Sequence, residues 1–278
     1  MKDTVIIYHG ECPDGFGAAW AAHKKFGDNA DYIPAHHNHP VPEGLVGKTV
    51  YLLDFAYPED VMSKVMGANK RVTAIDHHFS REKAIKMTQN YSYASDHSGS
   101  VLSWMYFHSG KPVPKLLEYI EDRDLWKWKI VDSDMICTFI DSFSFDFKEW
   151  DKLVNLLKKD SGIKKAVSQG NLMLKHELRL MGRIIGENAK IVSFMGHDVY
   201  AVNAPGFFAS HIGNALVKKK GPFAIVWNEE KDNIHVGLRS DGTIDVSKIA
   251  MKFGGGGHKA SAGFDLPSIS SFPWEKVE

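Results

Sequence analysis

The chain contains little cysteine, no excess of charge of either sign and no long hydrophobic run. Its 278 residues include two cysteines, Cys12 and Cys137, which are too few for a disulfide framework and lack the spacing of a zinc finger. The 34 Lys and Arg residues balance the 34 Asp and Glu residues, which argues against a strongly basic protein that coats long nucleic acids. No apolar run approaches the ~20 residues of a membrane helix, and the first residues lack the apolar core of a signal peptide. We therefore expect a cytoplasmic protein without a membrane partner.

The amino-acid composition is that of a folded, globular protein. Hydrophobic residues make up 44% of the chain and charged residues 24%, which argues against disorder. At roughly 150 residues per domain, the length indicates about two domains. The chain also has 14 histidines, and several of them stand beside aspartates.

Apolar runs and amphipathic stretches alternate in the first half of the chain. Strands are predicted at Thr4–Tyr8, Thr49–Asp54 and Arg71–Ile75. Helices are predicted at Gly15–Phe26, Pro58–Met66 (with Pro58 at the first helical position), Gly99–His108, Val113–Ile120 and Phe147–Leu157. This alternation predicts an α/β fold in which helices cover both faces of a mostly parallel sheet.

The second half of the chain predicts a smaller α+β domain. Apolar residues at helical spacing over Ser161–Glu187 predict a helix that connects the two domains. Strands are predicted at Lys190–Phe194, Val199–Val202, Phe223–Trp227 and Ile234–Leu238, with a helix at His211–Val217. We therefore expect a domain over residues 1–160, a connecting helix over 161–189, a second domain over 190–278, and a cleft between the two domains.

Three polar residues fall just past predicted strands of the first domain, namely His9, Asp54 and Asp76. Ligands of parallel sheets gather at the carboxyl ends of the strands, so these side chains are expected in one site. Carboxylates mixed with imidazoles suit Mn²⁺ or Mg²⁺, and less exclusively Zn²⁺ or Fe²⁺, whereas a soft thiolate site is not expected. Two such ions form the usual centre for attack on a phosphoester.

The Asp76-His77-His78 triplet after an apolar strand resembles the signature of the DHH phosphoesterase family. Three further motifs resemble that family's motifs in order and approximate spacing: His9 with Asp14-Gly15, Asp54, and Asp124 within Glu-Asp-Arg-Asp-Leu-Trp. The stretch Gly254–Gly263 resembles the glycine-rich motif of the DHH-associated C-terminal domain. The resemblance runs from residue 5 to about residue 265 and favours the nano-RNase or oligoribonuclease-like branch.

The resemblance implies roles for individual residues. The implied metal ligands are His9, Asp14, Asp54, His77 and Asp124, with Asp54 bridging two ions. Asp76 and His78 would be catalytic, since Asp76 would orient a histidine and His78 would contact the scissile phosphate or assist the leaving group. The implied cofactor is a pair of Mn²⁺ ions, with Mg²⁺ or another divalent ion as the alternative.

The C-terminal motif implies a grip on the substrate. His258 and the amides of Gly255, Gly256 and Gly257 would hold a phosphate or a terminal nucleotide, because successive glycine amides bind anions without steric obstruction. A flexible linker is the alternative for the glycine run, but the apolar residues before it and the polar residues after it favour a folded loop. Arg239 either contacts a substrate phosphate or forms a surface salt bridge.

The first motif departs from the family pattern, which often has two acidic residues separated by one. Asp14 is either the second acid, with Glu11 taking the place of the first, or the first acid, with Phe16 replacing the second. In the Asp96–Ser100 segment, a helix cap is one interpretation and contact of His97 or Ser98 with substrate is another. The His36–His39 tract is interpreted as a loop that either faces the substrate or is merely solvated.

Three functions are consistent with the sequence. The first is a metal-dependent phosphoesterase that cleaves short oligonucleotides, nucleoside bisphosphates or dinucleotides with a metal-activated water. The second is a hydrolase of phosphoanhydrides similar to a pyrophosphatase or an exopolyphosphatase, and the third is a nucleotide-binding protein with a weakened site. The expected partner is a short nucleotide substrate, and formation of a homodimer stays open.

Overall fold

The computed structural model describes residues 1–36, 40–230 and 233–277, which divide into two compact units, Met1–Lys175 and His176–Glu278. The first unit contains a sheet of five parallel strands in the order β2-β1-β3-β4-β5. Its strands are β1 Thr4–His9, β2 Ala30–Ala35, β3 Thr49–Leu53, β4 Arg71–Asp76 and β5 Asn90–Tyr93. The strand order reverses direction between β1 and β3, which is where parallel sheets of this kind bind ligands.

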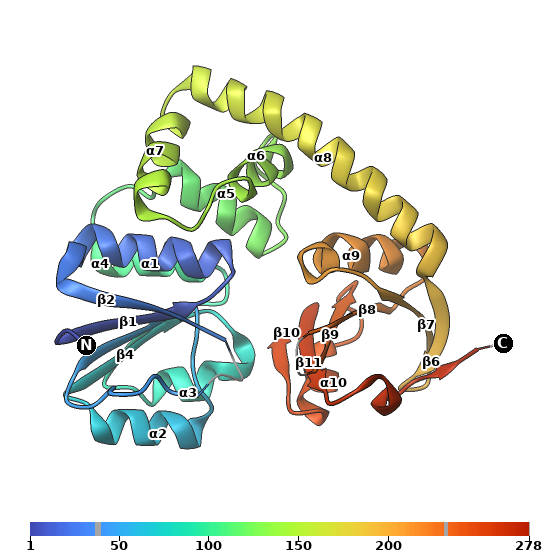
Figure 1. Ribbon diagram of the computed structural model, residues 1–278, viewed down its shortest axis with the longest axis horizontal. Helices are drawn as coiled ribbons and strands as arrows, with labels where there is room; N and C mark the ends of the chain where they lie inside the picture. The colour runs from blue at the N-terminus through green and yellow to red at the C-terminus, as the bar shows by residue number, and fades with distance from the viewer. Residues whose placement is uncertain (37–39, 231–232, 278) are drawn as a thin grey trace. The chain divides into compact units, whose positions relative to one another are not determined.

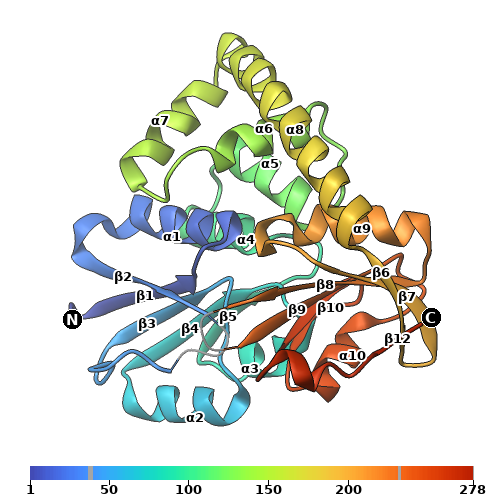
Figure 2. The same cartoon turned by 45° about the vertical axis from the view of Figure 1, so that its right-hand side comes forward.

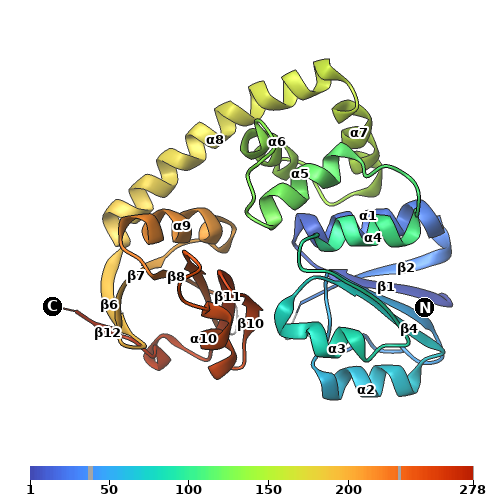
Figure 3. The same ribbon diagram turned by 180° about the vertical axis from the view of Figure 1, so that it is seen from behind.

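Helices cover both faces of this sheet, as expected (Figures 1 and 3). One face carries α1 Pro13–Phe26 and α4 Gly99–Phe107, and the other carries α2 Glu59–Ala68 and α3 Glu82–Lys86. Successive residues of a strand point to opposite faces. Thus Ile6 of β1 packs toward α1 and α4, whereas Val5 and Ile7 pack on the side of α2.

A helical layer packs on α1 of the first unit. It consists of α5 Lys115–Asp124, α6 Ser133–Asp141, α7 Phe147–Leu157 and the first part of α8 Asp160–Asn188. Its core combines aromatic and aliphatic side chains, among them Phe16, Trp20 and Trp150, each at most 2% exposed. The unit boundary falls within α8: Ala166 packs in this core, and Met181 packs in the core of the second unit.

The second unit contains a mixed sheet in the order β10-β11-β9-β8-β7-β6-β12. Its strands are β6 Lys190–Phe194, β7 His197–Asn203, β8 Phe223–Glu229, β9 Ile234–Ser240, β10 Gly256–His258, β11 Ser261–Leu266 and β12 Glu275–Lys276. Helix α9 Ala209–Lys219 packs on one face and α10 Val246–Lys252 on the other (Figure 2). The predicted fold class, a parallel α/β sheet followed by a second unit with its own sheet, is therefore confirmed.

Several elements differ from the sequence-based expectation. Strand β2 was not predicted because Pro34 interrupts its pattern, but β2 is an edge strand, where a missing N–H is tolerated. Pro58 precedes α2 as its N-cap residue instead of occupying the first helical position. The glycine run was predicted as a folded loop, but its second half forms β10, paired with β11. Strands β5, β11 and β12 and helices α3, α6 and α10 were also not predicted.

Candidate metal centre

Three of the predicted site residues of the first unit lie at the carboxyl ends of neighbouring strands. His9 is the last residue of β1, Asp54 directly follows β3, and Asp76 ends β4. These strands are adjacent and parallel, with β3 between β1 and β4. Their ends therefore converge at the point where the strand order reverses.

Asp54 stands at the middle of the centre and is 1% exposed. Its backbone is left-handed, with φ of 53°, a conformation that aspartate tolerates better than most residues. Its N–H donates to the carbonyl of Ile75 at 2.8 Å, which ties it to β4. A Cβ added at Gly99 would lie 2.5 Å from the Cβ of Asp54. Thus glycine is needed at position 99 to make room for this carboxylate.

The two carboxylate oxygens of Asp54 face different neighbours. Oδ2 lies 3.4 Å from Nδ1 of His9 and 4.0 Å from Sγ of Cys12. Oδ1 lies 3.2 Å from Nε2 of His77 and 3.8 Å from Nδ1 of His78. One side chain therefore joins two sets of metal-binding atoms.

Two groups of three donors contain the predicted metal ligands. His9, Cys12 and Asp54 form the first, and Asp14, His77 and Asp124 form the second; within each group the donor atoms all lie within 4.8 Å of one another. In the second group, Nε2 of His77 lies 3.8 Å from Asp14 and 3.5 Å from Asp124. All five predicted metal ligands are thus brought together, together with Cys12.

Asp14 is held by the start of α4. Its carboxylate, 1% exposed, accepts hydrogen bonds from the N–H groups of Gly99 at 2.7 Å and Ser100 at 3.0 Å. Unpaired N–H groups at a helix N-terminus favour a negative charge. A Cβ on Gly15 would lie 2.1 Å from the carbonyl oxygen of His9, so glycine is required for α1 to begin this close to β1.

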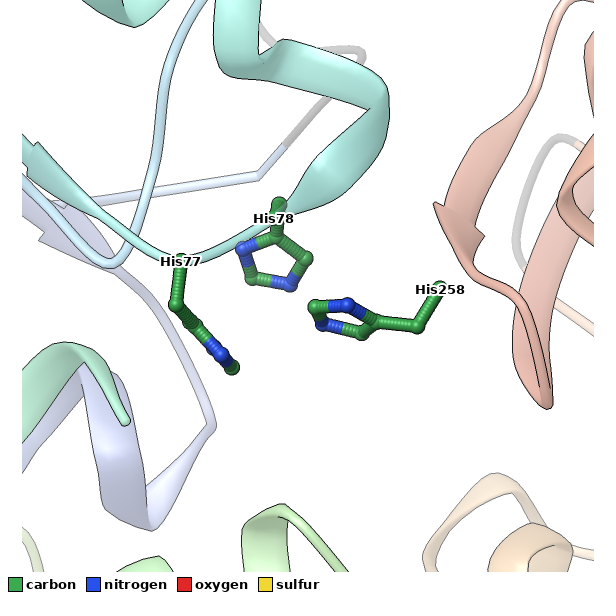
Figure 4. Close-up of side chains that lie close together, drawn as sticks. All are labelled: His77, His78 and His258. Atoms are coloured by element: carbon green, nitrogen blue, oxygen red, sulfur yellow. The ribbon is translucent and has the colours of Figure 1, made fainter. Parts of the chain in front are cut away.

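One carboxylate oxygen of Asp76 holds the Asp76-His77-His78 turn together. Oδ1 of Asp76 accepts from the backbone N–H of His77 at 2.7 Å and from that of His78 at 3.2 Å. The same oxygen lies 2.7 Å from Nδ1 of His78, and the buried Asp76 thereby orients that ring. Figure 4 shows the two imidazoles side by side on this turn.

Packing three carboxylates with imidazoles shifts their proton affinities. Burial lowers the pKa of His77, but Asp54, Asp124 and Asp14 outweigh it and raise the pKa to about 11. Burial, together with Asp54 and Asp124, raises the pKa of Asp14 well above its usual value. Burial opposes ionisation of Asp54, but the histidines hold its pKa well below the usual range. Such a cluster attracts positive charge, and its oxygen and nitrogen donors fit divalent cations.

The first motif had two alternative alignments, one with Glu11 as an acidic ligand and one with Phe16 in place of an acid, and the structure places both residues outside the donor groups. Glu11 is exposed and takes part in neither donor group of the described chain. Phe16 is 2% exposed and packs in the core against Phe147 and Trp150. The residue that enters the centre is Cys12, although a soft thiolate site was not expected from the sequence. Its spacing of two from Asp14, in the loop directly after a strand, was the signal available.

His97 and Ser98 are placed around the start of α4. Nδ1 of His97 lies 3.0 Å from Oε2 of Glu121, and the N–H of Ser98 donates to the same oxygen at 2.9 Å. Ser98 is fully buried and its hydroxyl caps α4 by accepting from the N–H of Val101. The capping interpretation of this segment therefore describes Ser98. In the His36–His39 tract, residues 37–39 lie outside the described residues.

In the second unit, two predicted substrate residues stand in one row of the sheet. Arg239 of β9 and His258 of β10 are both registered opposite Ser261 of β11. Residues opposite one another in antiparallel strands share a face. Helix α9 packs against Arg239, since a Cβ on Gly213 would lie 2.6 Å from its Cγ, and Nη2 donates to the hydroxyl of Ser210 at 2.8 Å.

Arg239 is not in a surface salt bridge within the part of the chain that the structure describes. Burial lowers the pKa of its guanidinium to about 10. A part-buried cation without an acidic partner is suited to an anion.

The glycine run has defined backbone roles. Gly254 and Gly257 have φ of 79° and 135°, where other residues are strained. The N–H of Gly255 donates to the carbonyl of Ala250 at 3.0 Å and so ends α10. That amide is already engaged, which differs from the expected phosphate contact.

Residues 191–278 match the DHHA1 domain family. An uncharacterized protein of Acanthamoeba polyphaga mimivirus is 30% identical over 300 residues, covering 99% of this chain and 70% of that protein. The Mn²⁺ complex of RecJ from Thermus thermophilus is 13% identical with a TM-score of 0.54, covering 97% of this chain and 50% of RecJ, and it shows a shared fold. The pGpG-specific phosphodiesterase PggH from Vibrio cholerae is 14% identical with a TM-score of 0.49, covering 97% of this chain and 94% of that one.

Among the described residues, no helix is long and apolar enough to cross a membrane.

Proposed function

We infer that this chain belongs to the DHH phosphoesterase family, whose members are metal-dependent hydrolases of phosphoester bonds, because its residues 191–278 match the DHHA1 domain family and it shares a fold with RecJ. From that premise we propose that it hydrolyses phosphoester bonds in short oligonucleotides, nucleoside bisphosphates or dinucleotides. We further propose that the centre holds two divalent ions, with Mn²⁺ as the first choice and Mg²⁺ as the alternative.

The proposal of a two-ion centre rests on the position of Asp54. Asp54 presents one oxygen to the group with His9 and Cys12 and the other oxygen to His77 of the group with Asp14 and Asp124. A carboxylate shared in this way suits two ions rather than one. When bound, the ions supply positive charge against the phosphate oxygens and lower the pKa of bound water.

The chain's own residues position these groups. The amides of α4 hold Asp14 in one orientation, and Asp76 holds the Nδ1 side of the His78 ring. With Nδ1 directed at a carboxylate, the ring donates from Nδ1, and in the protonated ring the N–H at Nε2 can also donate to a phosphate oxygen or give its proton to a leaving group. His78 is thereby proposed as the group that contacts the scissile phosphate.

The DHHA1 unit is proposed to grip the substrate. Arg239 and His258 stand on one face of the sheet, and Arg239 is a part-buried cation without an acidic partner within the described ranges. Both side chains can donate to phosphate oxygens. The zero net charge of the chain favours a short phosphate-bearing substrate over a long polymer, whose binding gains from many basic contacts.

A substrate panel tests the proposal. Short 5′-phosphorylated RNA, 3′-phosphoadenosine 5′-phosphate and dinucleotides are assayed in parallel with Mn²⁺, Mg²⁺ and Zn²⁺, with Asp124→Ala as the inactive control. We expect release of mononucleotide or phosphate from at least one substrate with wild-type protein only. No release from any of them would sink the proposal. Faster phosphate release from inorganic pyrophosphate would favour a phosphoanhydride hydrolase.

A further inference from the structure

Cys12 lies in the loop that joins β1 to α1, with its sulfur turned into the metal centre. Its Sγ is 4.0 Å from Oδ2 of Asp54, and its donor atom lies within 4.8 Å of both His9 and Asp54. The other cysteine, Cys137, is 1% exposed and its thiol donates to the carbonyl of Tyr119. Only one of the two thiols is therefore in reach of the centre.

The position of Cys12 is not explained by the helix that follows it. Cys12 is the N-cap of α1, a position where serine, threonine, aspartate and asparagine are preferred. Its side chain forms no capping hydrogen bond. At α4 and α7 the N-cap residues Ser98 and Asp146 do cap. The thiol thus turns away from the helix and toward His9 and Asp54.

Cys12 also completes the pattern of the two donor groups. Asp14, two residues farther along the same loop, contributes to the second group, and Cys12 contributes to the first. Without Cys12 the first group would have two donors, His9 and Asp54, and Asp54 also faces His77 of the second group. Bonds of roughly 2.0–2.3 Å to nitrogen, oxygen and sulfur separate ligand atoms by roughly 3–4 Å. The separations of 3.4 Å (His9 to Asp54) and 4.0 Å (Cys12 to Asp54) agree with this.

We propose that Cys12 is a metal ligand, and that the group of His9, Cys12 and Asp54 selects a borderline-soft ion such as Zn²⁺, Co²⁺ or Fe²⁺ over Mg²⁺. The inference rests on the metal centre of the proposed function and refines it. A thiolate with an imidazole and one carboxylate favours these ions, whereas Asp14, His77 and Asp124 offer two carboxylates and one imidazole, which suit Mn²⁺ or Mg²⁺. The two ions of the centre therefore occupy sites of different chemical hardness.

Cobalt provides a direct test without substrate. Wild-type protein is titrated with Co²⁺ while the near-ultraviolet sulfur-to-cobalt charge-transfer band is recorded. We expect the band in the wild type and in Cys137→Ala, and its loss in Cys12→Ser and Cys12→Asp. Bound cobalt without the band in the wild type, or a band that persists in Cys12→Ser, would overturn the proposal.

Thiol protection tests the same contact in unmodified protein, so the result does not depend on the folding of a variant. Alkylation of Cys12 is followed by peptide mass spectrometry with and without saturating Zn²⁺. We expect Zn²⁺ to slow the reaction by at least about tenfold, because the ion occupies the sulfur electrons that attack the reagent. Equal rates with and without Zn²⁺ would contradict the proposal.

Metal competition measures the selectivity. In the wild type, Zn²⁺ is expected to displace one Mn²⁺ per chain at a lower concentration than in Cys12→Asp, where an oxygen donor replaces sulfur. An unchanged preference in Cys12→Asp would argue against ligation by the thiol. Because these readouts need no turnover, a failed substrate panel with a positive cobalt band would refute the proposed substrates and leave the Cys12 ligand intact.

Discussion

Nε2 of His77 lies 3.2 Å from Oδ1 of Asp54, and each side chain is 2% exposed. Asp54 directly follows β3 and His77 directly follows the neighbouring β4, and the N–H of Asp54 donates to the carbonyl of Ile75 of β4. This contact links the second donor group to the carboxylate that also faces His9. Changes at these residues are therefore expected to act on both groups at once.

Replacement of Asp54 by asparagine removes the charge shared by the two groups. We expect Asp54→Asn to reduce kcat by roughly a thousandfold or more, about 4 kcal/mol, and to remove at least one bound ion per chain. Turnover and bound-metal stoichiometry are measured together. The exposed Asp60 of α2 supplies the control, since Asp60→Asn leaves the centre untouched. A full complement of tightly bound metal in Asp54→Asn would refute the bridging role.

Asp76 is expected to act through the orientation of His78, 2.7 Å away. Asp76→Asn keeps the shape but weakens the hydrogen bond to Nδ1, and we expect kcat to fall by roughly 10–100-fold with little change in KM. A shift of the pH–rate profile distinguishes orientation of a titrating ring from a purely structural effect. An unaltered pH profile with reduced protein stability would instead indicate a structural role only.

The DHHA1 unit is expected to contribute substrate binding rather than chemistry. His258→Ala should raise KM by roughly tenfold and leave kcat almost unchanged, the pattern of a lost binding contact. Steady-state kinetics on the best substrate of the panel measures both constants. Lys252→Ala, on an exposed position of α10, is the matched control. If KM does not rise in His258→Ala, His258 does not grip the substrate.

Gly99 is required by the close approach of α4 to Asp54, where a Cβ would lie 2.5 Å from the Cβ of Asp54. We expect Gly99→Ala to destabilise the protein by about 1–3 kcal/mol and to weaken metal binding. Gly67 of α2 has no heavy atom within 4 Å of an added Cβ, so Gly67→Ala should be neutral or stabilising by about 0.5–1 kcal/mol. Urea unfolding of the two variants measures the contrast, and equal effects would contradict it.

Burial raises the pKa of the Cys137 thiol from 9.0 to about 11. Because the folded pKa is above the unfolded one, this thiol's contribution to stability is complete below about pH 9 and is lost as the pH rises toward 11. The loss amounts to roughly 3 kcal/mol at most. Unfolding free energies of wild type and Cys137→Ala are compared from pH 7 to pH 11. The wild type should lose more stability, whereas parallel curves would show that the thiol does not titrate this way.

The pattern of apolar residues along the chain predicted the strands that are buried in the middle of the first sheet. Short apolar runs such as Thr49–Leu53 pack both faces in the buried middle of the sheet, so they stand out in the sequence. The edge strands β2 and β5 are only partly buried, and Pro34 is tolerated at the edge, so neither has that signature. Their existence follows from pairing with β1 and β4, which is a tertiary contact.

By itself, the sequence placed His9, Asp54 and Asp76 at the ends of parallel strands, because strand period and polarity are local properties, and its motifs supplied Asp14, His77 and Asp124 by their resemblance to a family. Only the tertiary structure decided which residue of the first motif enters the centre: Cys12 faces His9 and Asp54, while Glu11 is exposed. It also decided that Asp14 is held by amides of Gly99 and Ser100, far along the chain. The reason is physical, since side-chain direction in a turn and the approach of a distant helix depend on packing rather than on local sequence.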